Sequence, residues 1–162
     1  MLCMANDRWG DIMKTIAIAL VVLLGLVTPA SADDHKNKAK SADKAAIETA
    51  VFDYFHGQGE ASRERLFRAF DADNATMVGV TRGDDGAEAV RSWKDMSQVL
   101  SNWAANENPP GGDRDGEILS MDVVDDRIAV VMFRSADRFY DALTLGKVNG
   151  EWKIIAKAFI LQ

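Results

Sequence analysis

The sequence has almost none of the side chains that bind transition metals or form disulfides. Its 162 residues include one cysteine, Cys3, and two histidines, His35 and His56. Transition-metal sites are built mainly from clusters of His and Cys side chains. We therefore predict no metal site and no cofactor. We also predict no disulfide, because a single thiol has no partner within the chain.

An excess of positive charge and a long apolar run are missing as well. The chain has 19 basic and 25 acidic residues and a net charge of -6. Because nucleic-acid binding depends on Lys and Arg side chains that neutralise phosphates, we expect no nucleic-acid partner. The apolar run TIAIALVVLLGLV is shorter than the ~20 residues that a membrane-spanning helix needs. We therefore expect no stable membrane anchor.

The short apolar run is followed by the small residues of a cleavage site. It leads into TPASA, in which Ala30 and Ala32 form an A-x-A pattern before the charged segment DDHKNK. This order is typical of a signal peptide. We predict a signal peptide over residues 1–32, with Met13 as an alternative start, and a periplasmic or secreted protein without Cys3. An uncleaved N-terminal anchor is the alternative.

The remaining chain is long enough for one domain with its own core. The charged segment 33–43 predicts a flexible leader, and residues 44–162 form the domain. A first helix is predicted over 43–57 by apolar residues at helical spacing: Ile47, Ala50, Val51, Tyr54 and Phe55.

Two shorter helices are expected after the first. Ser62 can cap the second helix, and Ser92 with Asp95 suggests the start of the third. Trp93 and Trp103 fall on one stripe of this third helix. Packing in the core is the simpler interpretation of these tryptophans, and stacking on a ligand is the alternative.

The period of the apolar pattern changes from helical to alternating near Glu117. TMVGV predicts an earlier strand and TRGDDGAE a polar loop, and four strand-like runs follow from residue 117 to the C-terminus. Asn149-Gly150 is a strong hairpin signal, because a type I′ turn needs positive φ at both positions. Helices followed by an antiparallel meander predict an α+β domain, in which a curved sheet wrapped around helices leaves a cavity.

Two-residue turns allow the faces of the strands to be assigned by counting outward. With turns at 125–126, 136–137 and 149–150, Asp141 shares an apolar face with Arg134, while Glu117 opposes Arg134. The small residues Ala156 and Ala158 then leave space beside the acid. This face fits a mostly apolar pocket with a few polar groups. Alternatively, Asp141 pairs with Arg134 and only stabilises the packing.

The opposite face of the predicted sheet carries an apolar patch. It consists of Val131, Phe133, Tyr140, Ile155 and Phe159. A patch of this kind is too apolar for a fully solvated sheet face. We therefore expect a homodimer that forms through the outer face of the sheet.

Three stretches of the chain resemble a known family. They are DYFHGQGEASRERLFRAFDADNA, the helix start SWKDM, and RFYDALTLGKVNGEWKIIAKAF. They look like the family labelled "putative lumazine-binding" in the nuclear transport factor 2-like, or SnoaL-like, superfamily. The C-terminal motif of the family maps onto Phe139, Asp141, Leu143, Leu145, Gly150, Trp152, Ile154 and Lys157.

The resemblance implies a cystatin-like, cone-shaped α+β fold with about three N-terminal helices on a curved, mostly antiparallel sheet. It also implies a dimer, and a cavity between the helices and the concave sheet. The superfamily includes ketosteroid isomerase, polyketide cyclases and dehydratases, so it does not assign one activity.

Three functions are consistent with these observations. The first is an exported protein that binds a small, partly apolar molecule through Tyr54, Trp103, Arg134, Asp141 and Trp152. The second is an isomerase, cyclase or dehydratase in which Asp141 is the catalytic general acid or base, with Tyr54 or His56 as its partner. The third is a dimerisation or protein-interaction module. Binding is favoured over catalysis, because the sequence offers no clear second catalytic acid beside Asp141. Glu117 is the one further acid expected near the pocket face, and it opposes Arg134.

Overall fold

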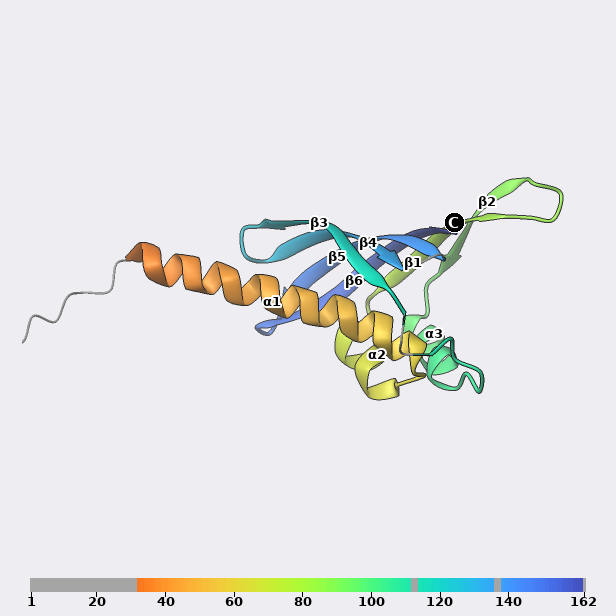
Figure 1. The fold of residues 1–162 in the computed structure, drawn as a ribbon, viewed down its shortest axis with the longest axis horizontal. Helices are drawn as coiled ribbons and strands as arrows, with labels where there is room; N and C mark the ends of the chain where they lie inside the picture. Colours follow the sequence, from red (N-terminus) through yellow and green to blue (C-terminus); the bar gives the residue numbers. More distant parts are fainter. Residues whose placement is uncertain (1–31, 112–113, 136–137, 162) are drawn as a thin grey trace, which may run out of the picture. The chain divides into compact units, whose positions relative to one another are not determined.

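The described part of the chain forms one mixed sheet with helices on one side of it. The computed structural model describes residues 32–111, 114–135 and 138–161. Six strands pair in the order β2-β1-β6-β5-β4-β3, antiparallel throughout except for β1 and β6 (Figure 1). Their bounds are β1 Thr76–Arg82, β2 Glu88–Trp93, β3 Gly116–Val124, β4 Ile128–Ser135, β5 Phe139–Val148 and β6 Glu151–Leu161. The predicted α+β class is confirmed.

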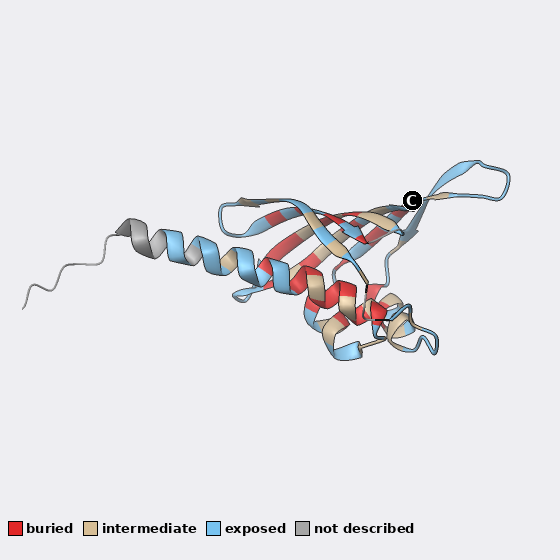
Figure 2. Ribbon diagram, in the orientation of Figure 1, coloured by how far each residue is buried: buried red, intermediate tan, exposed pale blue. Residues whose placement is uncertain are grey.

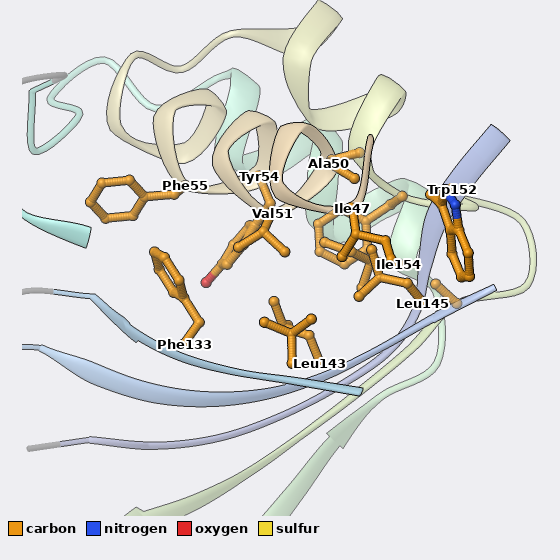
Figure 3. Close-up of a cluster of buried hydrophobic side chains, with 14 of the residues drawn as sticks. Ile47, Ala50, Val51, Tyr54, Phe55, Phe133, Leu143, Leu145, Trp152 and Ile154 are labelled. Carbon is orange, nitrogen blue, oxygen red and sulfur yellow. The ribbon is translucent and has the colours of Figure 1, made fainter. Parts of the chain in front are cut away.

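Helix α1 covers the sheet with one face of its C-terminal half. It runs over Ala32–Gly59 and so includes residues 33–43, the predicted leader. This segment is rich in Ala and Lys, which have high helix propensity. The predicted apolar residues of α1 are buried and point toward β4, β5 and β6, whereas the described side chains between residues 37 and 44 are mostly exposed (Figures 2 and 3).

The two short helices pack beside the C-terminal end of α1. Helix α2, Arg63–Ala69, is capped by Ser62 as predicted, and its Arg68 donates two hydrogen bonds to the buried carboxylate of Asp53 on α1. Helix α3, Met96–Ala104, is capped by Asp95 rather than by Ser92. Ser92 and Trp93 instead end strand β2, which forms a hairpin with β1 where only a polar loop was predicted.

The C-terminal meander is confirmed, but its register differs from the prediction at two bulges and at one turn. Asn149 and Gly150 have positive φ, as the predicted turn requires. A bulge interrupts β3 between Ile118 and Ser120, and another interrupts the β5–β6 pairing at Thr144 and Leu145. A bulge inserts an unpaired residue, so the faces beyond it change places.

The alternative in which Asp141 pairs with Arg134 is wrong, because the turn between β4 and β5 is longer than predicted. Ser135 pairs with Phe139, so three residues rather than two separate β4 from β5, and Asp141 lies opposite Phe133. Arg134 projects from the other face and donates to Glu117 across 2.6 Å in an exposed ion pair. The predicted opposition of Glu117 and Arg134 is confirmed.

The same shift changes which residues form the outer face of the sheet. Val131 and Phe133, expected on that face, are fully buried in the core. The residues that replace them are partly exposed and apolar: Val78, Val80, Ile128, Val130, Met132 and Ile160. An apolar outer face is therefore present, with a different composition from the predicted patch.

The predicted signal peptide lies outside the described residues, apart from its last position, Ala32. Across residues 32–111, 114–135 and 138–161, no helix is both long and apolar enough to cross a membrane.

Candidate functional site

A pocket of about 260 Å³ opens between the helices and the sheet. Its lining comes from α1, α3 and four of the strands. The lining residues are Tyr54, Gln58, Met77, Trp93, Val99, Asn102, Trp103, Phe139, Lys157 and Phe159. A pocket with mainly apolar walls and a few polar groups is the usual form of a small-molecule site.

Half of the residues that line the pocket are aromatic. The ring centroids of Trp93 and Phe159 lie 5.7 Å apart, and those of Tyr54 and Trp103 lie 6.0 Å apart. Phe139 meets Phe159 edge to face at 5.7 Å. Such walls offer flat, polarisable surfaces to a planar or apolar ligand.

Three buried polar side chains meet at one side of this pocket. The Tyr54 hydroxyl donates to Asp141 Oδ2 across 2.9 Å, and Lys157 Nζ donates to the Tyr54 oxygen across 2.9 Å. Lys157 also forms an ion pair and hydrogen bond with Asp141 Oδ1. The exposed fractions of these residues are 1% for Tyr54, 0% for Asp141 and 4% for Lys157. We call these three side chains the buried polar network.

The local structure explains how the network assembles. Tyr54 lies on the buried face of α1, and its hydroxyl points toward the sheet (Figure 3). Asp141 lies on the inner face of β5, as the alternation with Leu143 and Leu145 predicted. Lys157 reaches the same side because the β5–β6 register shifts by one residue, which places Lys157 opposite Leu143.

Burial controls the protonation of the network. Burial lowers the pKa of Lys157, and the neighbouring Asp141 carboxylate only partly offsets this effect. Burial also raises the pKa of Tyr54 well above its ordinary value, and the charge of Asp141 raises it further. Tyr54 therefore remains a neutral hydrogen-bond donor at physiological pH.

The structure brings together some of the predicted site residues and separates others. Tyr54 and Trp103 line the pocket, and Asp141 lies behind them, bound to Tyr54 and Lys157. Arg134 is on the outer face of the sheet and does not reach the pocket. Trp152 is buried beneath α1, where its Nε1 donates to Asp43 across 3.0 Å, and it does not line the pocket either.

Several lining residues were not predicted, and Lys157 is the most consequential of them. Simple counting from the Asn149-Gly150 turn placed Lys157 on the opposite face. Its place in the quoted C-terminal motif was a sequence signal for it. Gln58 and Asn102 supply amide groups to the lining. Trp93 reaches the pocket from a strand rather than from the predicted helix.

His56 lies apart from the buried polar network. Its ring contacts Phe52 and Phe55 on the same helix, with centroids 5.8 and 5.2 Å away. It is not among the residues that line the pocket. Within the described residues, no three His, Cys, Asp or Glu side chains are grouped so that they could hold a metal ion.

The arrangement can bind a ligand by two chemically different parts. The rings hold apolar surface, while the Lys157 ammonium group and the Tyr54 oxygen present polar atoms beside an acid. Both carboxylate oxygens of Asp141 already accept hydrogen bonds, one from Tyr54 and one from Lys157. The carboxylate is therefore better placed to fix the other two groups than to contact a ligand.

Solved structures similar to this chain share its fold. An NTF2-like protein of unknown function from Shewanella baltica is 21% identical, with a TM-score of 0.59 over 82% of this chain and 98% of that one. A second, from Silicibacter pomeroyi, is 23% identical, with a TM-score of 0.60 over 76% and 98%. A ketosteroid isomerase-like protein from Erwinia carotovora is 14% identical, with a TM-score of 0.54 over 72% and 94%.

Comparison with protein families identifies the chain more directly. No curated protein sequence matches it. The family described as "Putative lumazine-binding" matches residues 42–160, which include every residue of the pocket and of the buried polar network. The chain belongs to this family and has an NTF2-like fold.

Proposed function

We propose that this protein is exported and binds one small, partly apolar molecule in the pocket described above. One observation carries the proposal: an aromatic pocket of about 260 Å³ borders a buried, charged hydrogen-bonding network. Membership of a family described as lumazine-binding supports small-molecule binding in general. The A-x-A sequence that ends at Ala32 supports export.

The lining limits the kind of ligand that fits. The volume of about 260 Å³ lies just below the ~300–1,000 Å³ typical of ligand pockets, so the ligand is small. Flat rings on several sides favour an aromatic or conjugated molecule. The third ammonium hydrogen of Lys157 favours an oxygen acceptor at the inner end of the ligand, and Gln58 and Asn102 favour further polar atoms.

A retained ligand would test this proposal directly. Native mass spectrometry of protein purified from its own host should show the chain with one bound small molecule. Val99→Trp should abolish the complex by filling the pocket, because Val99 lines it. The matched variant Val90→Trp places the same ring on a residue that is 72% exposed and outside the pocket, and it should retain the ligand. Equal retention by both variants would contradict the proposal.

An isomerase-type, cyclase-type or dehydratase-type enzyme is the second candidate. The hydrogen bond between Tyr54 and Asp141 favours it, because a tyrosine held by an acid can protonate or polarise a carbonyl group. The Erwinia protein described as ketosteroid isomerase-like is compatible with this chemistry. Binding remains the better supported function, because Asp141 is fully paired. Conversion of the retained molecule into a released product, lost in Tyr54→Phe, would favour the enzyme instead.

A further inference from the structure

We propose that Lys157 is a nucleophilic amine that captures a small aldehyde or ketone in the pocket as a reversible imine. This inference rests on the proposed binding function, and it names the reactive group of the ligand. It concerns a residue that sequence counting placed on the wrong face of the sheet.

The contacts of Lys157 suit a neutral amine. Within the described residues, Nζ donates hydrogen bonds to two acceptors, Asp141 Oδ1 and Tyr54 Oη. A neutral amine has two hydrogens and one lone pair, so these two acceptors use its hydrogens and leave the lone pair available. Lys157 is itself part of the pocket lining, so a bound carbonyl group can approach it.

Burial favours loss of a proton from the Lys157 ammonium group. Lys157 is 4% exposed, which disfavours its charged form, while Asp141 accepts one of its hydrogens. The lowered pKa of Lys157 agrees with this loss. A desolvated lysine amine is the usual nucleophile of proteins that form imines.

The covalent step balances without any further reactant. The ammonium group releases one proton to water, and the amine lone pair forms a C–N bond with the carbonyl carbon as the C=O π bond breaks. One amine hydrogen moves to the former carbonyl oxygen, which gives a carbinolamine. A proton from water then reaches the carbinolamine hydroxyl, which leaves as water while the C=N bond forms. The product is a protonated imine beside the Asp141 carboxylate, so the buried ion pair is restored.

The surroundings of Nζ favour the imine over its hydrolysis. The rings of Phe159, Tyr54 and Phe139 have centroids 4.8, 4.9 and 5.7 Å from Nζ. They limit the water that reaches the reacting atoms. Their faces also stabilise the positive charge of the protonated imine.

Reductive trapping tests the inference on the full chain. The protein is incubated at neutral pH with 2-naphthaldehyde and sodium cyanoborohydride, which reduces an imine to a stable amine. We expect one naphthylmethyl group per chain, located at Lys157 by peptide mapping. Lys157→Arg should lose this adduct, whereas Lys44→Arg, at an exposed position of α1, should retain it.

Two further outcomes separate this inference from the proposed function. 2-Naphthalenemethanol has the same rings without a carbonyl group, and its binding is followed by quenching of Trp93 and Trp103 fluorescence. If the alcohol and the aldehyde bind but the wild-type adduct is absent from Lys157 or spread over exposed lysines, the imine proposal is overturned and the binding pocket stands. If neither compound binds, this test contradicts both proposals. Mapping of the wild-type protein gives the answer even if Lys157→Arg does not fold.

Discussion

Lys157 Nζ donates a hydrogen bond to the Tyr54 hydroxyl across 2.9 Å, which joins β6 to α1 across 103 residues of sequence. Both side chains also bind Asp141, so the three residues hold the helix against the sheet beside the pocket. The same contacts therefore stabilise the fold and supply the polar groups of the proposed binding site. Substitutions in this network should affect both stability and binding.

Asp141→Asn should lower the free energy of unfolding by about 3–5 kcal/mol, because it leaves the buried Lys157 without an opposite charge. The change preserves the shape of the side chain, so packing should not contribute much. Urea unfolding of the wild type and the variant, followed by circular dichroism, measures the difference.

Glu117→Gln provides the matched control for that experiment. It also removes one partner of an ion pair, but Arg134 and Glu117 are exposed. Exposed pairs contribute roughly 0–1 kcal/mol. Equal losses of stability in the two variants would show that the burial of Asp141 and Lys157 has no special energetic role.

Tyr54→Phe should change how stability depends on alkaline pH. The pKa of Tyr54 is raised in the folded protein, so above the ordinary value of 10.0 the unfolded chain loses a proton that the folded chain retains. The wild type should therefore lose stability as pH rises above that value, and this contribution should be absent from the Phe variant. Urea unfolding across the alkaline range measures it. Parallel stability curves for the two proteins would contradict the assignment.

The sequence was a good guide to the elements of this fold and a poor guide to the faces of its strands. The buried stripe of α1, the Ser62 cap, the Asn149-Gly150 turn and the four C-terminal strands are set by local patterns, and all are present. In β4, however, both sets of alternating residues are apolar: Ile128, Val130 and Met132 on one face, and Ala129, Val131 and Phe133 on the other. Alternation alone could not choose between them.

The candidate site depended on features that local patterns do not encode. Asp141 and Tyr54 were found because each interrupts or ends an apolar stripe. Lys157 was misplaced because a bulge near Thr144 and Leu145 moves every later residue of β6 to the other face. Its buried position becomes favourable only through Asp141 and Tyr54, which are distant in sequence. Trp93 was assigned to a helix because Ser92 and Asp95 imitate a capping box.

Signal-peptide cleavage after Ala32 predicts that the exported protein begins at Asp33. Edman sequencing of material recovered from outside the cytoplasm checks this. Signal peptidases require small side chains at the two alanines of an A-x-A site, so Ala32→Gln should block cleavage. Ser31→Gln changes the unrestricted middle position and should be processed normally. A mature chain that retains the apolar run in the wild type would favour the N-terminal anchor instead.

The outer face of the sheet should mediate the predicted homodimer. Met132 and Ile160 are 36% and 48% exposed, and with Val80, Tyr140, Ala142, Ala158 and Phe159 they line a shallow groove of about 220 Å³. Exposed apolar surface of this kind is costly in water and is removed by association.

Met132→Glu should yield monomers, because the dimer would bury a charge without a partner. Val148→Glu introduces the same charge at the end of the β5–β6 hairpin, at a residue that is 39% exposed, and it should remain dimeric. Multi-angle light scattering distinguishes the two states. Phe133 belongs to the patch expected from the sequence, but it is buried in the core, so its substitution cannot test the interface. A wild-type monomer at micromolar concentration would contradict the prediction.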